Sequence, residues 1–200
     1  MKLNKFHHIL LPLILVTVLW SCKTEQKDYE YSFNNYPDRF ICDSLDTKLI
    51  KEAFYSYEED IYNYNNDPKK KNLMKAMAKW INHAIKEKVT PEQIISERTV
   101  TLFKMLKKKH PEFWINNQGE MTLNLDSPFM TCVFNNIDDN NVKTTFLALK
   151  DTNTFKPELV EPLLTGNYSR LAIDPYLNHY AVFQYGFGRM FNKDLTTIKD

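Results

Sequence analysis

The sequence predicts a mostly α fold, a single helical domain of about five to seven helices with at most a short strand or hairpin. Two observations lead to this prediction. Apolar residues recur every three or four positions in several segments between residues 43 and 191. Strand-like alternation is confined to the short run Met121, Leu123 and Leu125, which is too isolated to form a sheet domain. One folded domain, over residues 42–200, is expected at this length.

Three helices are expected in the first half of this domain. The first starts near Asp43 or Ser44, either of which can cap it, and its apolar face continues to Ile61. A second covers residues 69–88. A third begins at Thr90, a cap residue followed by proline at the first helical position. It ends near residue 110, because the proline at 111 disfavours helix in the residue before it.

The second half of the domain is expected to start with a turn at residues 116–119 and an extended segment near 121–125. Ser127 followed by proline favours a helix over 128–136, and further helices are expected over 141–150 and 157–164. The last helix, from Asp174 to Phe191, is apolar nearly all round, which is typical of a buried helix. Its aromatic residues indicate core more than a ligand cleft. Any ligand pocket is expected between this helix and its neighbours.

The start of the chain has a different pattern. The first five residues include two lysines, and an uncharged apolar stretch follows from Ile9 to Leu19. This stretch is shorter than the roughly 20 residues needed to span a bilayer. Trp20, Ser21 and Cys22 follow at once, and residues 23–28 are entirely polar. A hydrophobic residue, then a small residue directly before a cysteine, at such a boundary resembles the lipobox of bacterial lipoproteins.

This resemblance implies a signal peptide over residues 1–21, cleavage before Cys22 and acylation of its thiol, with palmitate among the acyl chains. It also implies a cell-envelope protein held at the outer membrane by its lipid, because two or more acyl chains anchor a protein stably. Residues 22–41 are expected to form a flexible tether, since they mix charge, Asn and Tyr without a sustained period. Residues 26–30 are similar to a short export signal of surface lipoproteins, so the periplasmic and the surface face both stay open.

Two cysteines remain after the proposed anchor, Cys42 and Cys132. An exported compartment permits disulfides, and an even number of cysteines favours pairing. The alternative is two buried free thiols that pack as small apolar side chains.

The charge distribution gives one candidate surface. The full chain has a net charge of only +1, so no nucleic-acid partner is expected. Residues 68–109 are nevertheless rich in lysine, which suggests a patch for an anionic partner such as lipid headgroups or an acidic glycan. The alternative is a solvated face beside the acidic first helix. The patch consists of Lys69, Lys70, Lys71, Lys75, Lys79, Lys107, Lys108 and Lys109.

No sequence motif indicates catalysis. The histidines lack zinc-site spacing, residues 136–147 lack the glycine and glutamate of a calcium loop, and the acids at 58–60 are expected on a solvated helix face. No cofactor, metal or catalytic residue is therefore expected. The expected function is a non-catalytic binding or interaction module for an unknown protein or glycan. A periplasmic immunity or envelope-assembly helper is one alternative, and an enzyme of unknown type is another.

Overall fold

A computed structural model describes residues 29–43, 45–191, 193–196 and 198. The predicted signal peptide (1–21) and Cys22 lie outside these residues. The chain divides into two units, Met1–Tyr31 and Ser32–Asp200, and every described helix and strand belongs to the second. No described helix is long and apolar enough to cross a membrane.

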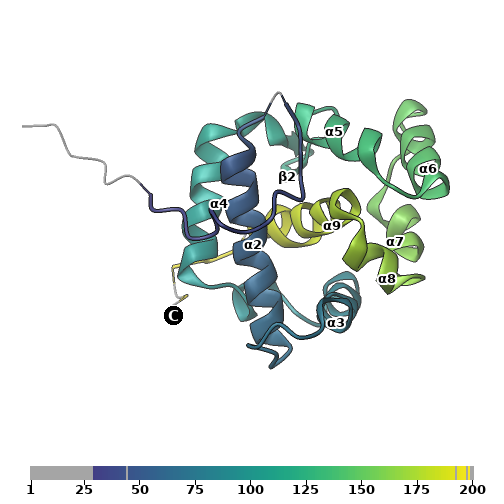
Figure 1. Cartoon of the computed structure of the whole chain (residues 1–200). Coiled ribbons are helices and arrows are strands. Elements are labelled where there is room, and N and C mark those ends of the chain that lie inside the picture. Colours follow the sequence, from purple (N-terminus) through teal and green to yellow (C-terminus); the bar gives the residue numbers. More distant parts are fainter. Residues whose placement is uncertain (1–28, 44, 192, 197, 199–200) are drawn as a thin grey trace, which may run out of the picture. The chain divides into compact units, whose positions relative to one another are not determined.

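Helices dominate the second unit, which confirms the predicted fold class (Figure 1). Besides short 3-10 turns at Pro91–Gln93 (η1) and Pro111–Phe113 (η2), the described α-helices are α2 Thr47–Tyr64, α3 Leu73–Ile85, α4 Glu97–Lys109, α5 Pro128–Asn136, α6 Asn140–Asp151, α7 Pro157–Thr165, α8 Tyr168–Ile173 and α9 Pro175–Ala181. All but α8 overlap segments predicted to be helical, although some bounds differ by a few residues. At six residues, α8 is too short to show a helical period.

Some helices start later than predicted, because a polar side chain accepts hydrogen bonds from backbone N–H groups at a different position. Asp46 caps α2 by accepting a hydrogen bond from the Leu49 N–H, so the predicted cap at residue 43 or 44 is wrong. Asp67 accepts bonds from the N–H groups at 71 and 72, which holds that stretch in a turn, and α3 begins only at Leu73. The capping box at Thr90 supports only η1. A second cap, Ser96, starts α4.

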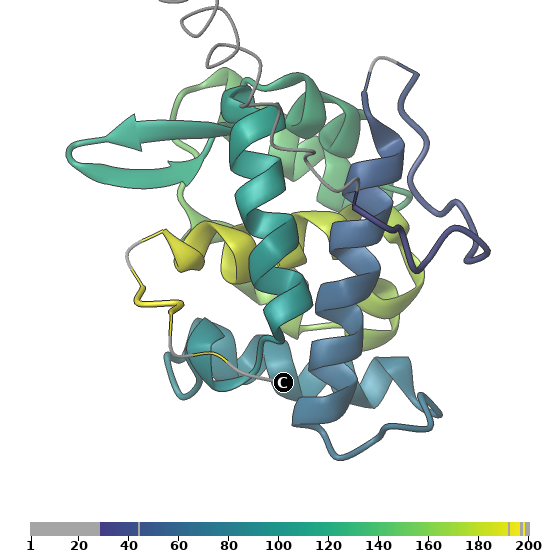
Figure 2. The same cartoon turned by 90° about the vertical axis from the view of Figure 1, so that its left-hand side faces the viewer.

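The extended segment is one half of a hairpin. Strand β1 (Trp114–Asn117) pairs antiparallel with β2 (Glu120–Leu123), with Trp114 opposite Leu123. Gln118 and Gly119 connect the strands with φ of +53° and +97°, the double positive φ that characterises two-residue hairpin turns. Figure 2 shows the hairpin projecting beyond the helices.

The core is organised around a C-terminal helical run, which consists of α9, a π-helix (η3, Val182–Gly186) and a 3-10 turn (η4, Phe187–Met190). Figure 2 shows this run crossing behind the pair α2 and α4, and in Figure 1 it extends to the right from α2. Phe183 packs against Phe129 at a ring distance of 4.4 Å, and Tyr180 packs against Phe146 at 5.0 Å. Burial of the last helix was therefore predicted correctly.

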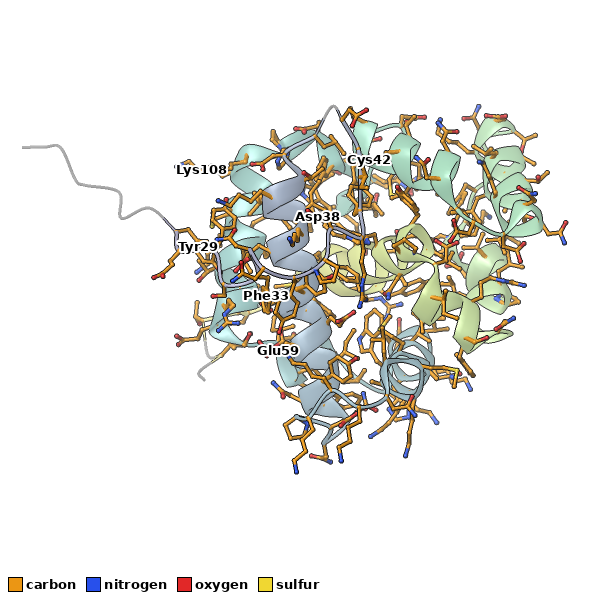
Figure 3. The ribbon with its side chains drawn as sticks, in the orientation of Figure 1. Tyr29, Phe33, Asp38, Cys42, Glu59 and Lys108 are labelled. Atoms are coloured by element: carbon orange, nitrogen blue, oxygen red, sulfur yellow. A yellow bond between two sulfur atoms is a disulfide. The ribbon has the colours of Figure 1, made fainter. Side chains whose placement is uncertain are left out.

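Residues 32–41 belong to the folded unit, although the sequence predicts them as part of the tether. Phe33 and Phe40 are buried, and the Glu52 carboxylate accepts hydrogen bonds from the N–H groups of Ser32 and Phe33 at 2.7 and 2.9 Å. Lys51 forms an ion pair with Asp38 at 2.8 Å. Figure 3 shows Phe33 and Asp38 lying along α2. The three aromatic residues of this segment, Phe33, Tyr36 and Phe40, lie among polar residues and a proline, in a run too short to give a sustained periodic signal for this packing.

A disulfide joins the end of this segment to α5. The Cα atoms of Cys42 and Cys132 are 6.2 Å apart, within the range of protein disulfides. The bond closes a loop with a sequence separation of 90 residues. It therefore links the segment beside α2 covalently to α5, a helix that packs on α9.

We expect reduction of this disulfide to lower the free energy of unfolding by about 4–5 kcal/mol, because the open chain regains the entropy of a long loop. Guanidinium denaturation with and without reductant measures the change. A Cys42→Ala/Cys132→Ala variant serves as the control and should be insensitive to reductant. Identical midpoints for the wild type in both conditions would contradict the prediction.

Candidate functional site

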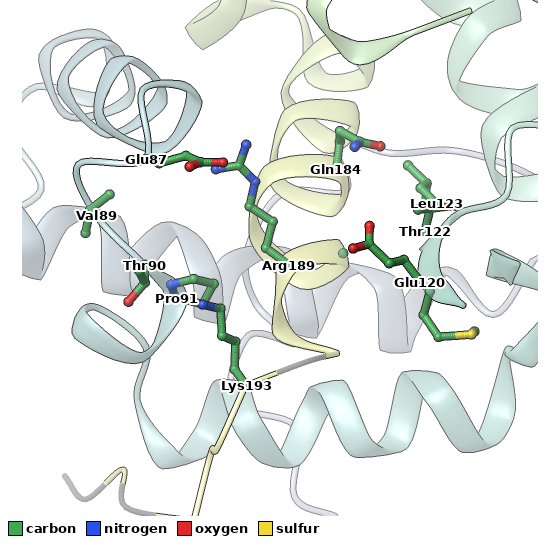
Figure 4. A pocket seen from close by; sticks show the side chains of 12 residues that line it. Glu87, Val89, Thr90, Pro91, Glu120, Thr122, Leu123, Gln184, Arg189 and Lys193 are labelled. Atoms are coloured by element: carbon green, nitrogen blue, oxygen red, sulfur yellow. The ribbon is translucent and has the colours of Figure 1, made fainter. Parts of the chain in front are cut away.

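A pocket with a volume of about 430 Å³ lies against the C-terminal run. This size is within the range of small-ligand sites. Three segments wall it: the stretch from Glu87 to Pro91 after α3, strand β2, and the C-terminal residues Gln184, Gly188, Arg189 and Lys193. Figure 4 shows these side chains around the opening. The pocket therefore lies between the last helix and its neighbours, where the sequence predicts any pocket to be.

The π-helix places one wall of this pocket. A π turn adds a residue to a helix and is frequently found at functional sites. Here it contains Gln184, and Arg189 follows in η4. Gly186 lies against Tyr57 of α2, where a Cβ atom would come within 2.7 Å of the ring, so only glycine permits this approach. The close packing on one side of the run holds Gln184 and Arg189 toward the pocket on the other.

Arg189, a charged residue of the pocket, is held by two contacts. Its guanidinium donates a hydrogen bond to the carbonyl oxygen of Ala84 at the end of α3, and lies 5.1 Å from the centre of the Tyr185 ring. Within the described ranges it forms no ion pair with a carboxylate. Because a guanidinium has five N–H donors, Arg189 keeps donors for a carboxylate or phosphate ligand.

Two carboxylates face the same space from different walls. Glu87 follows α3 with φ of +53°, where its N–H bonds to Ala84 and the next N–H bonds to His83, a helix ending that usually has glycine at this position. Glu120 is the first residue of β2, and its side chain points into the pocket (Figure 4). A third acid, Glu92, is paired with Lys193 at 3.6 Å. The pocket thus combines both signs of charge.

The predicted lysine patch is divided in two. Lys70 pairs with Glu59 near the end of α2 at 2.8 Å, and Lys109 lies 4.0 Å from Asp46 at the start of α2. These acids stand roughly 20 Å apart at a rise of ~1.5 Å per helical residue. Figure 3 shows Lys108 and Glu59 toward opposite ends of the α2–α4 pair. Lys69, Lys71, Lys75 and Lys79 group with the first site, and Lys107 and Lys108 with the second. The eight lysines do not form one continuous surface.

Two of the three acids at residues 58–60 are buried, contrary to the expectation of a solvated face, whereas Glu59 is partly exposed and pairs with Lys70 and Arg98. Glu58 and Asp60 are 7% and 2% exposed. Asp60 accepts hydrogen bonds from the Thr99 hydroxyl at 2.5 Å and from the Ser96 N–H at 3.2 Å, which fixes the start of α4 against α2. Burial raises the pKa of Asp60 to about 6. These carboxylates have structural partners and lie away from the pocket.

The histidines of the described residues occupy three separate places. His83 accepts or donates a 2.6 Å hydrogen bond with the Tyr64 hydroxyl, and His110 lies 3.0 Å from the Glu112 carboxylate. His179 stacks between Phe40 and Phe54, with ring distances of 4.5 and 4.0 Å. In the described ranges no three His, Cys, Asp or Glu side chains gather as a metal-binding group.

Sequence reasoning placed the pocket but missed most of the side chains in it. Glu87, Glu120 and Gln184 carry no motif, and each comes from a different element. The apolar period that predicts a helix gives no information on which polar residue faces which neighbour. Comparison with protein-family models, with curated proteins and with solved structures finds no match to this chain.

We expect the stability of the protein to fall as the pH drops from about 6.5 toward 3. Burial lowers the pKa of His179 to about 3, below its ordinary 6.5, so the folded state resists a proton that the unfolded chain accepts. The loss is on the order of 4 kcal/mol at the acid end of this window. Denaturant titrations at several pH values measure it.

A His179→Phe variant retains an aromatic ring between Phe40 and Phe54 but cannot be protonated, so its stability should depend less on pH. Asp60, whose raised pKa acts in the opposite direction, is present in both proteins and cancels in the difference. Equal pH dependence of the wild type and the variant would show that His179 does not cause the loss.

Proposed function

We propose that this protein is a lipid-anchored lipoprotein of the cell envelope, held at the outer membrane through Cys22, that binds a ligand non-catalytically in the pocket beside the C-terminal run. The observation that carries the binding role is the convergence of Arg189, Gln184, Glu87 and Glu120 from separate elements on one pocket. The lipobox resemblance of residues 19–22 carries the anchor.

The way these groups are held favours binding over catalysis. A nucleophile or general acid needs a partner within hydrogen-bond reach that changes its reactivity. Arg189 instead donates to a main-chain carbonyl and lies on a tyrosine ring, and these contacts orient it without pairing it with a carboxylate of the described residues. A fixed arginine beside carboxylates on other walls suits recognition of a polar ligand.

The anchor is tested directly by a Cys22→Ala substitution. Because the acyl chains hold the protein at the bilayer, we expect the variant to leave the membrane fraction or to accumulate as an unprocessed precursor of lower gel mobility. Fractionation with immunoblotting, together with labelling by a palmitate analogue, measures both effects. Cys42→Ala is the matched control and should stay lipidated. A Cys22→Ala protein that remains in the membrane and takes up label would refute the anchor.

The binding role is tested with size fractions of an envelope extract. A ligand that binds only the folded state raises the melting temperature. We expect at least one fraction to stabilise the wild type but not a Gln184→Tyr variant, whose larger side chain fills the pocket. Lys104→Tyr, on the exposed side of α4, is the size-matched control and should respond like the wild type.

Mass spectrometry of the active fraction then separates binding from catalysis. Recovery of the ligand with unchanged mass supports a binding module. Conversion to a product by the wild type, and not by Gln184→Tyr, would favour an enzyme instead. The absence of any stabilising fraction would count against the pocket as a binding site.

A further inference from the structure

Strand β2 has a free edge. Asn117 and Glu120 flank the two-residue turn and form the first hydrogen-bonded pair, as in hairpins of this type. In an antiparallel hairpin, hydrogen-bonded and non-hydrogen-bonded pairs alternate. At the other end of this hairpin the Asn124 N–H donates to the Phe113 carbonyl at 2.8 Å, as this alternation requires. Met121 and Leu123 fall between these pairs, so their N–H and C=O groups point away from β1. No described backbone group outside the hairpin bonds to them.

This free edge opens into the pocket. Four consecutive residues of β2, from Glu120 to Leu123, line it. Successive side chains of a strand point to opposite faces, so a cavity touched by all four runs along the edge of the strand. An extended chain entering there can continue the hairpin as a third strand, a mode in which backbone hydrogen bonds supply affinity.

The charges on the walls define what kind of chain fits. Arg189 stands across the pocket from β2 with unused donors (Figure 4), and a fork of N–H groups matches a carboxylate. Glu87 and Glu120 would repel a ligand with several negative charges. A single carboxylate on an otherwise neutral or basic extended chain satisfies both conditions, and the C-terminal end of a peptide has this chemistry.

We propose that the pocket binds the C-terminal end of an extended peptide, whose backbone pairs with Met121 and Leu123 and whose terminal carboxylate meets Arg189. This proposal rests on the proposed binding function and names the class of its ligand.

The test uses the full chain solubilised from membranes in mild detergent and labelled with a fluorophore. Hexapeptides randomised at every position are attached to beads through their amino ends, which leaves the carboxylates free. The best-binding sequence is then synthesised in four soluble forms: the free acid, the C-terminal amide, and two free acids in which one or the other set of alternate backbone nitrogens is methylated. We expect the amide, and the methylated form whose blocked nitrogens face β2, to bind at least ten-fold more weakly than the free acid, because each loses one of the two recognition elements.

Two variants test the protein side of the same contacts. The Met121 N–H points away from β1, so Met121→Pro removes an edge donor without removing a hairpin bond. Met121→Ala keeps the N–H and serves as the control for the lost side chain. We expect at least ten-fold weaker binding of the free acid to Met121→Pro, and near-wild-type binding to Met121→Ala. The peptide series still decides the question if Met121→Pro fails to fold.

Each contrary result identifies what has failed. Equal affinity of the free acid and both alternate-nitrogen methylated registers would overturn strand pairing, and equal affinity of acid and amide would overturn the contact with Arg189. If no hexapeptide binds while an envelope fraction still stabilises the wild type, the peptide proposal falls and the binding function stands. If neither binds, both fall.

Discussion

The burial of the C-terminal helical run is the interaction on which the rest of the fold depends. Tyr180 contacts the aromatic residues of α5 and α6, and Phe183 contacts Phe129 of α5 together with Phe113 and Trp114 before and within the hairpin. α2 reaches the same run through Tyr57, which lies over Gly186. Elements far apart in the sequence thus share one packing partner, in addition to the contacts that pairs such as α2 and α4 make with each other. Large aromatic side chains contribute most of the apolar area that such a core buries.

The segment from Ser32 to Cys42 further stabilises this arrangement by connecting α2, α5 and α9. It is held by backbone bonds to Glu52, by the stack of Phe40 on His179, and by the disulfide to α5. His179 belongs to α9, so the segment is attached to the central run as well as to α2. The proposed lipid anchor would therefore be joined to the domain through a stretch of chain that is part of its core.

The sequence predicted the features that repeat and missed those that depend on single contacts. Seven helices follow from apolar period and cap residues, because those signals extend over several turns. The start of α4 at Glu97 could not be foreseen, since it depends on Asp60 reaching Ser96 and Thr99 from another helix. For the same reason Glu58 and Asp60 seemed to be solvated. The location of the pocket followed from the apolar character of the last helix, whereas its polar lining depends on how the hairpin and the end of α3 face that helix.

The π-helix also sets the angular phase of the C-terminal run. Each residue of an α-helix turns the chain by about 100°, so the extra residue in a π turn offsets everything that follows by a similar angle. Val182–Gly186 lies between α9, whose Tyr180 packs against α5 and α6, and η4, which contributes Arg189 to the pocket. A regular helix through this point would keep α9 in place and rotate Arg189 away from the β2 edge. The extra residue in the π turn, several positions before Arg189, therefore determines whether the arginine side chain faces the pocket.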